Sequence, residues 1–285
     1  MKVVLAEQKV FNKKQVAIYI SIGVICIISI IVALYIQFYA RIDIGKLLGF
    51  RTEVELGNKT EEETQLLKAQ FDHIFTNSLH NEEAQTNKKK ESEKALVYTK
   101  IERKESKVNS YDVEVHIPYI NIDNEKIEEY NKEIEDFVNK TANVLATQNK
   151  NIIYTVEYVA NVQNDMLSLI IRSNLKEGSS AQRVIIQTYN YDLRNNKEIT
   201  LEEVLKIKNM NSFELQEKIK SEISMEQKKV EDLKTLGYTI YSREIESDKY
   251  KIENTKEFYV TNNTLYVIYA YGNETFTSEV DLIVV

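Results

Sequence analysis

The sequence predicts an α+β protein: an antiparallel sheet with helices packed on one side, preceded by a single transmembrane helix. Three observations predict this fold class. The stretch from Lys14 to Arg41 is apolar and has no charge between its ends, several later segments alternate apolar and polar residues, and others repeat apolar residues at helical spacing. These patterns divide the chain into a cytoplasmic tail (1–14), a transmembrane anchor (15–40), a juxtamembrane stretch with an amphipathic helix and a polar linker (41–95), and an extracytoplasmic α+β domain (96–285).

The first predicted element is the membrane anchor. A helix needs about 20 apolar residues to cross the hydrocarbon, because its backbone groups must bond within the segment. The apolar core of a cleaved signal peptide is shorter, about 7–15 residues, and small residues follow it. Here the run is longer, and bulky Phe38 stands where a small residue is needed. We therefore expect an uncleaved anchor that contacts the lipid bilayer through 15–40 and includes Val16, Ile20, Ile25, Ile30 and Leu34.

The charges that flank the anchor predict its orientation. Four lysines precede it, whereas Arg41, Lys46 and Arg51 follow it, an excess of one cation on the short side. The positive-inside rule then favours a cytoplasmic N-terminus. The tail is also too short for a folded unit. We expect a single-pass protein of the cell membrane with its C-terminal domain outside the cytoplasm.

The charge and cysteine content restrict the classes of partner. The whole chain carries a net charge of −7, and the first 14 residues contribute +3, so the remainder carries −10. Nucleic acid is excluded as a partner, because its binding depends on neutralisation of phosphates by Lys and Arg. A basic protein or a cation is favoured. The only cysteine, Cys26, lies in the anchor, so a hydrophobic core must hold the domain together without disulfides.

The juxtamembrane stretch contains a predicted helix. Thr60 and Glu63 form a capping box, in which each side chain satisfies a free amide at the helix start. Helical spacing then continues to Leu79, and a polar linker follows over 80–94. The apolar stripe of this helix either packs on the domain or on a second copy, or it binds a partner.

The domain opens with a strand, a long helix and three further strands. Apolar residues alternate from Tyr111 to Tyr119, and they recur with helical spacing from Asp123 to about Thr147. Three alternating segments then follow with tight turns between them, which predicts an antiparallel meander over 152–162, 167–175 and 184–193.

The last third of the domain holds two helices and a hairpin. Thr200 and Glu203 form a second capping box at the start of a short helix. A longer helical pattern covers about 212–230. At the end, strands from 257–260 or 265–271 are expected to pair with 276–285.

One stretch of this domain resembles a known family. The residues from Tyr189 to Leu205, Tyr-Asn-Tyr-Asp-Leu-Arg-Asn-Asn-Lys-Glu-Ile-Thr-Leu-Glu-Glu-Val-Leu, resemble the signature of the ectodomain of RsiV-type anti-sigma factors, which sense lysozyme. A similar domain of unknown function stands beside the catalytic domain of a Gram-positive peptidoglycan deacetylase. The resemblance covers 96–285 and implies that ectodomain fold and a recognition role.

The chain departs from this family in two places. Family members usually bear a Tyr/Pro-rich segment near the end, and here 269–278 takes its place without the proline. The cytoplasmic tail is also too short to form the helical unit that sequesters a sigma factor. What the resemblance implies for this chain is therefore the fold and recognition, not sigma-factor control.

A search for catalytic and metal-binding patterns points away from an enzyme. His73 and His80 are seven residues apart, about 10 Å along a helix, whereas a shared metal requires a spacing of three or four. His116 has no neighbouring ligand, and the chain has no Gly-rich phosphate loop or nucleophile elbow. We expect no catalytic residue, cofactor or metal. A carboxylate pair of a hydrolase among the 44 acids stays as an alternative.

Tyrosine is the enriched residue type that suits recognition, with 18 tyrosines and no tryptophan. The pairs Tyr154 with Tyr158 and Tyr189 with Tyr191 are expected in the core, because their strand faces are apolar. The candidate recognition segment comprises Tyr269, Tyr271, Glu274 and Phe276.

The functional hypothesis is a non-enzymatic recognition or sensory module that binds a basic protein or a cell-wall component. The alternative is an accessory domain that positions a separate wall hydrolase or deacetylase.

Overall fold

The computed structural model describes residues 59–82, 88–147, 151–262 and 264–285. All of them belong to one compact unit, Gly57–Val285. The predicted anchor over 15–40, with Val16, Ile20, Ile25, Ile30 and Leu34, lies outside the described residues. Among the described residues, no helix has both the length and the apolar character that a membrane crossing requires.

The described elements confirm the α+β class. The first half of the unit contains α3 (Glu61–Gln70), η1 (Phe71–His73), β1 (Ser78–His80), β2 (Val97–Lys107), β3 (Tyr111–Ile120), α4 (Glu125–Ala146) and β4 (Ile152–Gln163). The second half contains β5 (Met166–Glu177), β6 (Arg183–Asp192), β7 (Lys197–Glu198), α5 (Leu201–Ile207), α6 (Ser212–Thr235), η3 (Asp248–Tyr250), η4 (Ile252–Asn254), β8 (Glu257–Thr261), β9 (Thr264–Ala270), η5 (Tyr271–Asn273) and β10 (Val280–Val284).

The larger sheet is mixed, so the expectation of an antiparallel sheet was wrong for two of its pairings. Its seven strands follow the order β2-β3-β4-β5-β6-β7, and β1 pairs with the second half of β4. The helix α4 returns the chain to the end where β3 began, so β4 runs parallel to β3, with Val113 opposite Tyr154. β1 is also parallel to β4. The meander β4-β5-β6 is antiparallel, as predicted.

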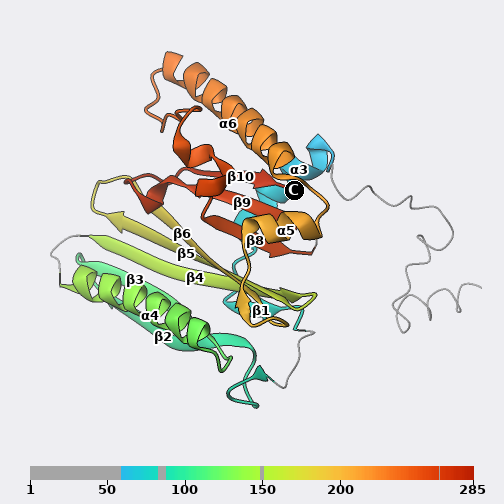
Figure 1. Cartoon of the computed structure of the whole chain (residues 1–285). Coiled ribbons are helices and arrows are strands. Elements are labelled where there is room, and N and C mark those ends of the chain that lie inside the picture. The colour runs from blue at the N-terminus through green and yellow to red at the C-terminus, as the bar shows by residue number, and fades with distance from the viewer. Residues whose placement is uncertain (1–58, 83–87, 148–150, 263) are drawn as a thin grey trace, which may run out of the picture. The chain divides into compact units, whose positions relative to one another are not determined.

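The helices lie on two sides of the unit, so the expectation that they pack on one side was also wrong. Figure 1 shows α4 on one face of the seven-stranded sheet and the three-stranded sheet β10-β9-β8 on the other, with α5 and α6 beyond it. The strands of the smaller sheet are buried on both faces, and β9 is buried at every position. The second sheet therefore requires a second layer of helices to cover its outer face.

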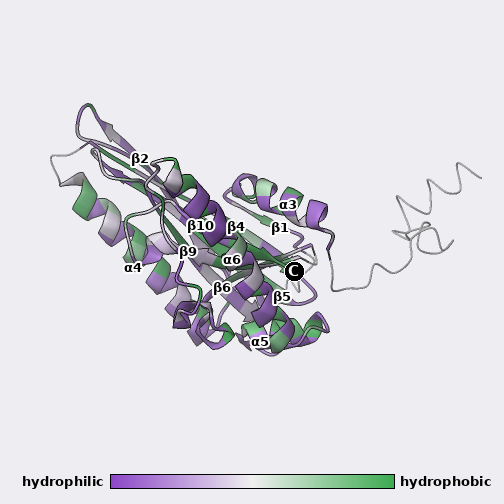
Figure 2. Ribbon diagram, turned by 90° about the horizontal axis from the view of Figure 1, so that it is seen from above, coloured by the Kyte–Doolittle hydropathy of each residue, from purple (hydrophilic) through white to green (hydrophobic). Residues whose placement is uncertain are grey.

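Three apolar cores fill the spaces between these layers. The first lies between α4 and the larger sheet and contains Ile134 of α4 against Tyr154 and Tyr158. The second lies between the smaller sheet and the helices α5 and α6. The third lies between the two sheets, where Phe71 beside α3 packs on Tyr266 with ring centroids 5.4 Å apart. Both α4 and α6 alternate hydrophobic and hydrophilic stretches along their length, as expected for helices with one covered side (Figure 2).

The helix starts agree with the sequence, and one helix end does not. Both predicted capping boxes are present, at Thr60 with Glu63 and at Thr200 with Glu203. The helix predicted to reach Leu79 ends as α3 at Gln70, and η1 follows it. The chain then turns through a left-handed residue, Asn77 with φ 52°, and Leu79 becomes part of β1.

A row of polar side chains from the larger sheet bonds to the edge strand β8. Phe258 donates its N–H to Thr188 at 3.1 Å, and its carbonyl accepts from Asn190 at 2.9 Å. Val260 donates to Ser168 at 3.0 Å, and its carbonyl accepts from Asn161 at 3.2 Å. These side chains come from β4, β5 and β6, and they take the place of a neighbouring strand. We call Asn161, Ser168, Thr188 and Asn190 the polar clamp.

Candidate functional site

Two members of the predicted recognition segment are buried. Tyr269 and Tyr271 are 7% and 1% exposed and belong to the core between the smaller sheet and α6. The Tyr269 hydroxyl lies 3.1 Å from that of Thr255, and the Tyr271 hydroxyl lies 2.8 Å from that of Tyr250. Burial raises the pKa of Tyr269 to about 12. Neither ring is available to a partner in this arrangement.

The other two members of the segment are exposed to solvent. Glu274 forms an ion pair with Lys249 at 2.9 Å. Phe276 is 46% exposed, and the Arg183 guanidinium lies 5.5 Å from its ring centroid. Of the predicted recognition residues, only Glu274 and Phe276 therefore present side chains to solvent.

The segment between β9 and β10 covers the free edge of β6. Asn273 accepts from the Ile186 N–H and donates to its carbonyl, both at 2.9 Å. Val184 donates its N–H to the Thr277 carbonyl at 3.1 Å. A Cβ at Gly272 would lie 1.8 Å from the Val184 carbonyl oxygen, so this close approach requires glycine. The sequence signal for this role is the pair Gly272-Asn273.

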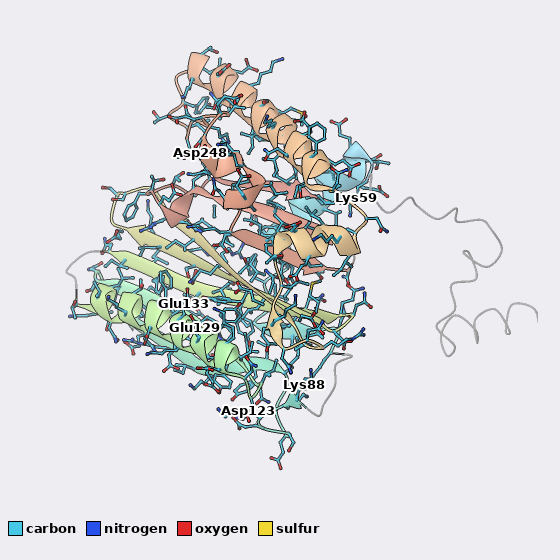
Figure 3. All side chains as sticks on the ribbon, viewed as in Figure 1. Lys59, Lys88, Asp123, Glu129, Glu133 and Asp248 are labelled. Atoms are coloured by element: carbon cyan, nitrogen blue, oxygen red, sulfur yellow. The ribbon has the colours of Figure 1, made fainter. Side chains whose placement is uncertain are left out.

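A pocket of about 580 Å³ lies beside this segment and contains a half-buried carboxyl group, that of Glu257. The Thr188 hydroxyl donates to it at 2.9 Å. Burial raises the pKa of Glu257 to about 7, the Thr188 hydrogen bonds and Lys256 oppose the shift, and Glu133 adds to it. Figure 3 shows Glu133 on α4, and Asp248 lines the pocket itself. Tyr269, Tyr271 and Glu274 also line it, whereas Phe276 does not.

A larger cleft, of about 620 Å³, follows the edge of the smaller sheet. We call it the β10 cleft. Its walls come from α3 and η1, from α6, from β5 and β6, and from the chain around Arg243. The residues that line it are Lys68, Phe71, Asp72, Arg172, Asn174, Gln182, Val184, Ile186, Glu222, Ile223, Glu226, Arg243, Ser278, Glu279, Val280, Asp281, Leu282 and Ile283.

The β10 cleft has more acids than cations. Five carboxylates and three cations line it, which gives a net charge of −2. Lys68 of α3 binds Glu222 of α6 at 2.6 Å, so this ion pair joins two walls of the cleft. Arg172 binds Asp72 at 3.0 Å. The carboxylates of Glu226 and Glu279 are 30% and 37% exposed and are open to a further cation.

A buried polar network holds the floor of the β10 cleft. Arg243 donates from Nε and Nη2 to the two carboxylate oxygens of Asp281, each at 2.7 Å. The Tyr271 hydroxyl donates to the same carboxylate. The ring of Tyr241 stacks on that of Tyr271 with centroids 4.2 Å apart. Burial raises the pKa of the Tyr271 hydroxyl, and the Asp281 charge raises it further. These bonds fix Asp281 and Arg243 in place beside β10.

Sequence reasoning missed the β10 cleft because its residues come from distant parts of the chain. The one local signal is a cation within an apolar strand, Arg172 among Leu169, Ile170 and Ile171. The three histidines do not form a site. Within the described residues, no group of three or more His, Cys, Asp or Glu side chains is arranged to hold a metal ion.

The structural likenesses of this chain to solved proteins include two DUF3298 family proteins. No protein-family model and no curated protein sequence matches this chain. A DUF3298 family protein from Bacteroides fragilis is similar at 13% identity, over 59% of this chain and 81% of that one, with a TM-score of 0.33. A DUF3298 family protein from Pseudomonas aeruginosa is similar at 11% identity, over 59% and 80%, with a TM-score of 0.35. The neighbours of this fold among solved structures thus include DUF3298 proteins.

Proposed function

We propose that this chain is a single-pass, membrane-anchored, extracytoplasmic recognition module that binds a basic protein without catalysing a reaction. The observation that carries the proposal is the β10 cleft, which combines an apolar wall with a surplus of carboxylates. The net charge of −10 beyond the first 14 residues supports the same class of partner. Charge of one sign on a surface attracts a partner of the opposite sign and speeds association.

The exposed carboxylates of the β10 cleft supply the contacts for that partner. The Glu279 carboxylate lies 3.5 Å from the Arg243 guanidinium. Arg243 makes its two closer bonds to Asp281 and not to Glu279. Glu226 pairs with Lys229, a lysine 61% exposed to solvent. An arginine or lysine of a basic protein can replace Lys229 at Glu226, because exposed ion pairs contribute little in water. It can also bind the exposed side of Glu279, whose neighbour Arg243 is buried.

The test is calorimetry of the full-length protein against lysozyme, a basic wall-active protein, at low and at physiological salt. Glu226→Gln and Glu279→Gln are expected to weaken binding, and so is added salt, since the screening length is about 8 Å at physiological ionic strength. Glu231→Gln is the matched control, because it removes the same charge from the exposed side of α6 outside the cleft. Equal losses of affinity in all three variants, or binding that does not depend on salt, would reject the β10 cleft as the binding site.

The accessory-domain alternative uses the same cleft with a different partner. In that case the domain holds a wall hydrolase or deacetylase near its substrate. Lysozyme then does not bind, and a purified wall enzyme from the same envelope binds with the same sensitivity to Glu226→Gln.

A second candidate function, carbohydrate hydrolysis, is favoured by Glu257. A carboxyl group with a pKa of about 7 in a pocket of about 580 Å³ suits a general acid. Two further carboxylates, those of Asp248 and Glu274, line the same pocket. The test is release of reducing ends from purified peptidoglycan, with Glu257→Gln as the inactive variant. Absence of turnover by the unmodified protein would remove this candidate.

A further inference from the structure

The strand β10 is an outer strand of the smaller sheet and, among the residues that the structure describes, pairs only with β9. Tyr271 donates its N–H to the Glu279 carbonyl at 3.2 Å, and Leu265 and Val285 exchange both of their backbone bonds. Backbone groups alternate in direction along a strand, so the N–H and carbonyl of Val280 and of Leu282 point away from β9. Among the described residues, no group accepts from or donates to these four backbone groups.

Two other strand edges of the described unit are covered, and a third carries exposed charges. The polar clamp bonds to β8, and Asn273 with Thr277 bonds to β6. The outer strand β2 exposes Lys100, Glu102 and Lys104, charges that oppose pairing with another strand. Along Val280 and Leu282, the edge of β10 has no such hydrogen bonds from the described residues. This edge lies inside the β10 cleft.

The walls of the β10 cleft match the two faces of an added strand. The side chains of Val280 and Leu282 pack toward the larger sheet with Phe71, whereas those of Asp281 and Ile283 face the α6 side. A strand beside β10 would lie about 4.8 Å away, and its side chains would alternate over the same two walls. One set would meet Phe71, Val184 and Ile186, and the other would meet Glu222 and Glu226.

We propose that the free edge of β10 binds an extended segment of a basic partner by β-strand addition, with apolar and Lys or Arg residues alternating in that segment. This inference rests on the proposed function and specifies how the partner is bound. Charge complementarity selects the occupant, because the cleft carries −2. A second copy of this chain would bring two acidic clefts together and repel itself. Main-chain hydrogen bonds supply the affinity in this mode, and alternate side chains supply the specificity.

The first test is an N-methyl scan with a synthetic peptide, acetyl-Val-Lys-Val-Arg-Val-Lys-Val-amide, measured by calorimetry against the full-length protein. Each N-methyl group removes one backbone donor. Methylation at one set of alternate positions is expected to weaken binding about tenfold or more, whereas methylation at the other set leaves it nearly unchanged. Equal effects at both sets would overturn strand addition.

The second test removes a donor from the protein. Val280→Pro eliminates the N–H that faces the cleft, and proline is tolerated at the first residue of an edge strand. Its matched control is Val280→Ala, which shortens the side chain and keeps the N–H. We expect Val280→Pro to bind the peptide about tenfold more weakly than Val280→Ala, with similar thermal unfolding midpoints. If the proline variant does not fold, the N-methyl scan still decides.

The outcomes separate the two proposals. Lysozyme binding without an alternating N-methyl pattern would overturn strand addition and leave the recognition function standing. No binding of lysozyme or peptide would overturn both. A dimer of the full-length protein that Val280→Pro dissociates would assign the edge to a second copy and reject the basic partner.

Discussion

Replacement of Glu257 by glutamine is expected to change how the stability of this protein depends on pH. Its carboxyl group has a pKa of about 7, raised from 4.5 chiefly by burial. The native state therefore keeps a proton that the unfolded chain releases between about pH 4.5 and pH 7. Stability from this group is fully present below the unfolded pKa and is lost as the pH rises through the folded pKa. The expected slope is negative across that window.

The magnitude follows from the shift. One pKa unit equals about 1.36 kcal/mol, so a rise from 4.5 to about 7 costs at most about 3 kcal/mol of stability at pH 8. Glutamine keeps an oxygen that accepts from Thr188, which donates to Glu257 at 2.9 Å, and it carries no charge. Glu257→Gln is therefore expected to stabilise the protein at pH 8 and to have little effect near pH 4.5.

The assay is urea unfolding at pH 4.5 and pH 8, followed by far-ultraviolet circular dichroism. Glu274→Gln serves as the control, because it makes the same substitution at a carboxylate that is 64% exposed. A change in free energy that is the same at both pH values would refute the reasoning. Destabilisation by Glu257→Gln at pH 8 would show that the carboxylate form is the one that the fold needs.

The remaining predictions concern packing, backbone bonding and topology. Tyr158→Ala is expected to cost about 3–5 kcal/mol in urea unfolding, and Tyr158→Phe much less, because phenylalanine keeps the buried ring and loses the hydroxyl contact with Thr99 at 2.8 Å. Asn190→Ala should cost about 1–3 kcal/mol by the same assay, since it leaves the Phe258 carbonyl without its donor. Gly272→Ala should lower the thermal midpoint more than Gly178→Ala, because only Gly272 lacks space for a Cβ. Protease added to intact cells should remove the domain and leave the anchor, and full protection would contradict the predicted orientation.

The parts of the fold that follow a local pattern were predictable from the sequence. The helix α4 has one apolar stripe, including Ile127, Ile134 and Val138, and all three side chains are buried. The capping boxes depend on residues three apart, so the sequence places those helix starts directly. The meander also follows from alternation and turn residues, because Asn164 and Asp165 separate two long strands.

The two-sheet arrangement was not predictable from these patterns. Every residue of β9 is buried, so the strand has no polar face to reveal which side meets solvent. The parallel pairing of β3 with β4 depends on which sheet edge β4 joins after α4, and no local spacing encodes that choice. The end of α3 at Gln70 depends on β1 pairing with β4, which lies far along the chain.

The candidate site shows the same limit. Tyr269 and Tyr271 have the residue type and alternation of a recognition surface, yet residues from other segments cover both rings. Two of their hydroxyl partners, Thr255 and Tyr250, are more than ten residues away in the sequence. Burial of a tyrosine depends on such distant neighbours, so the sequence alone did not separate these two from the exposed Phe276.

The polar clamp has a consequence for the order in which the protein folds. Asn161, Ser168 and Asn190 come from three different strands, and they bind consecutive backbone groups of β8 only when those strands are already in register. The smaller sheet therefore needs the finished meander as a template, whereas the meander has its own apolar contacts with α4. We expect β4 to β6 with α4 to form the folding nucleus and the strands β8 to β10 to dock late. In hydrogen exchange, the amides of β8 should lose protection before those of β5.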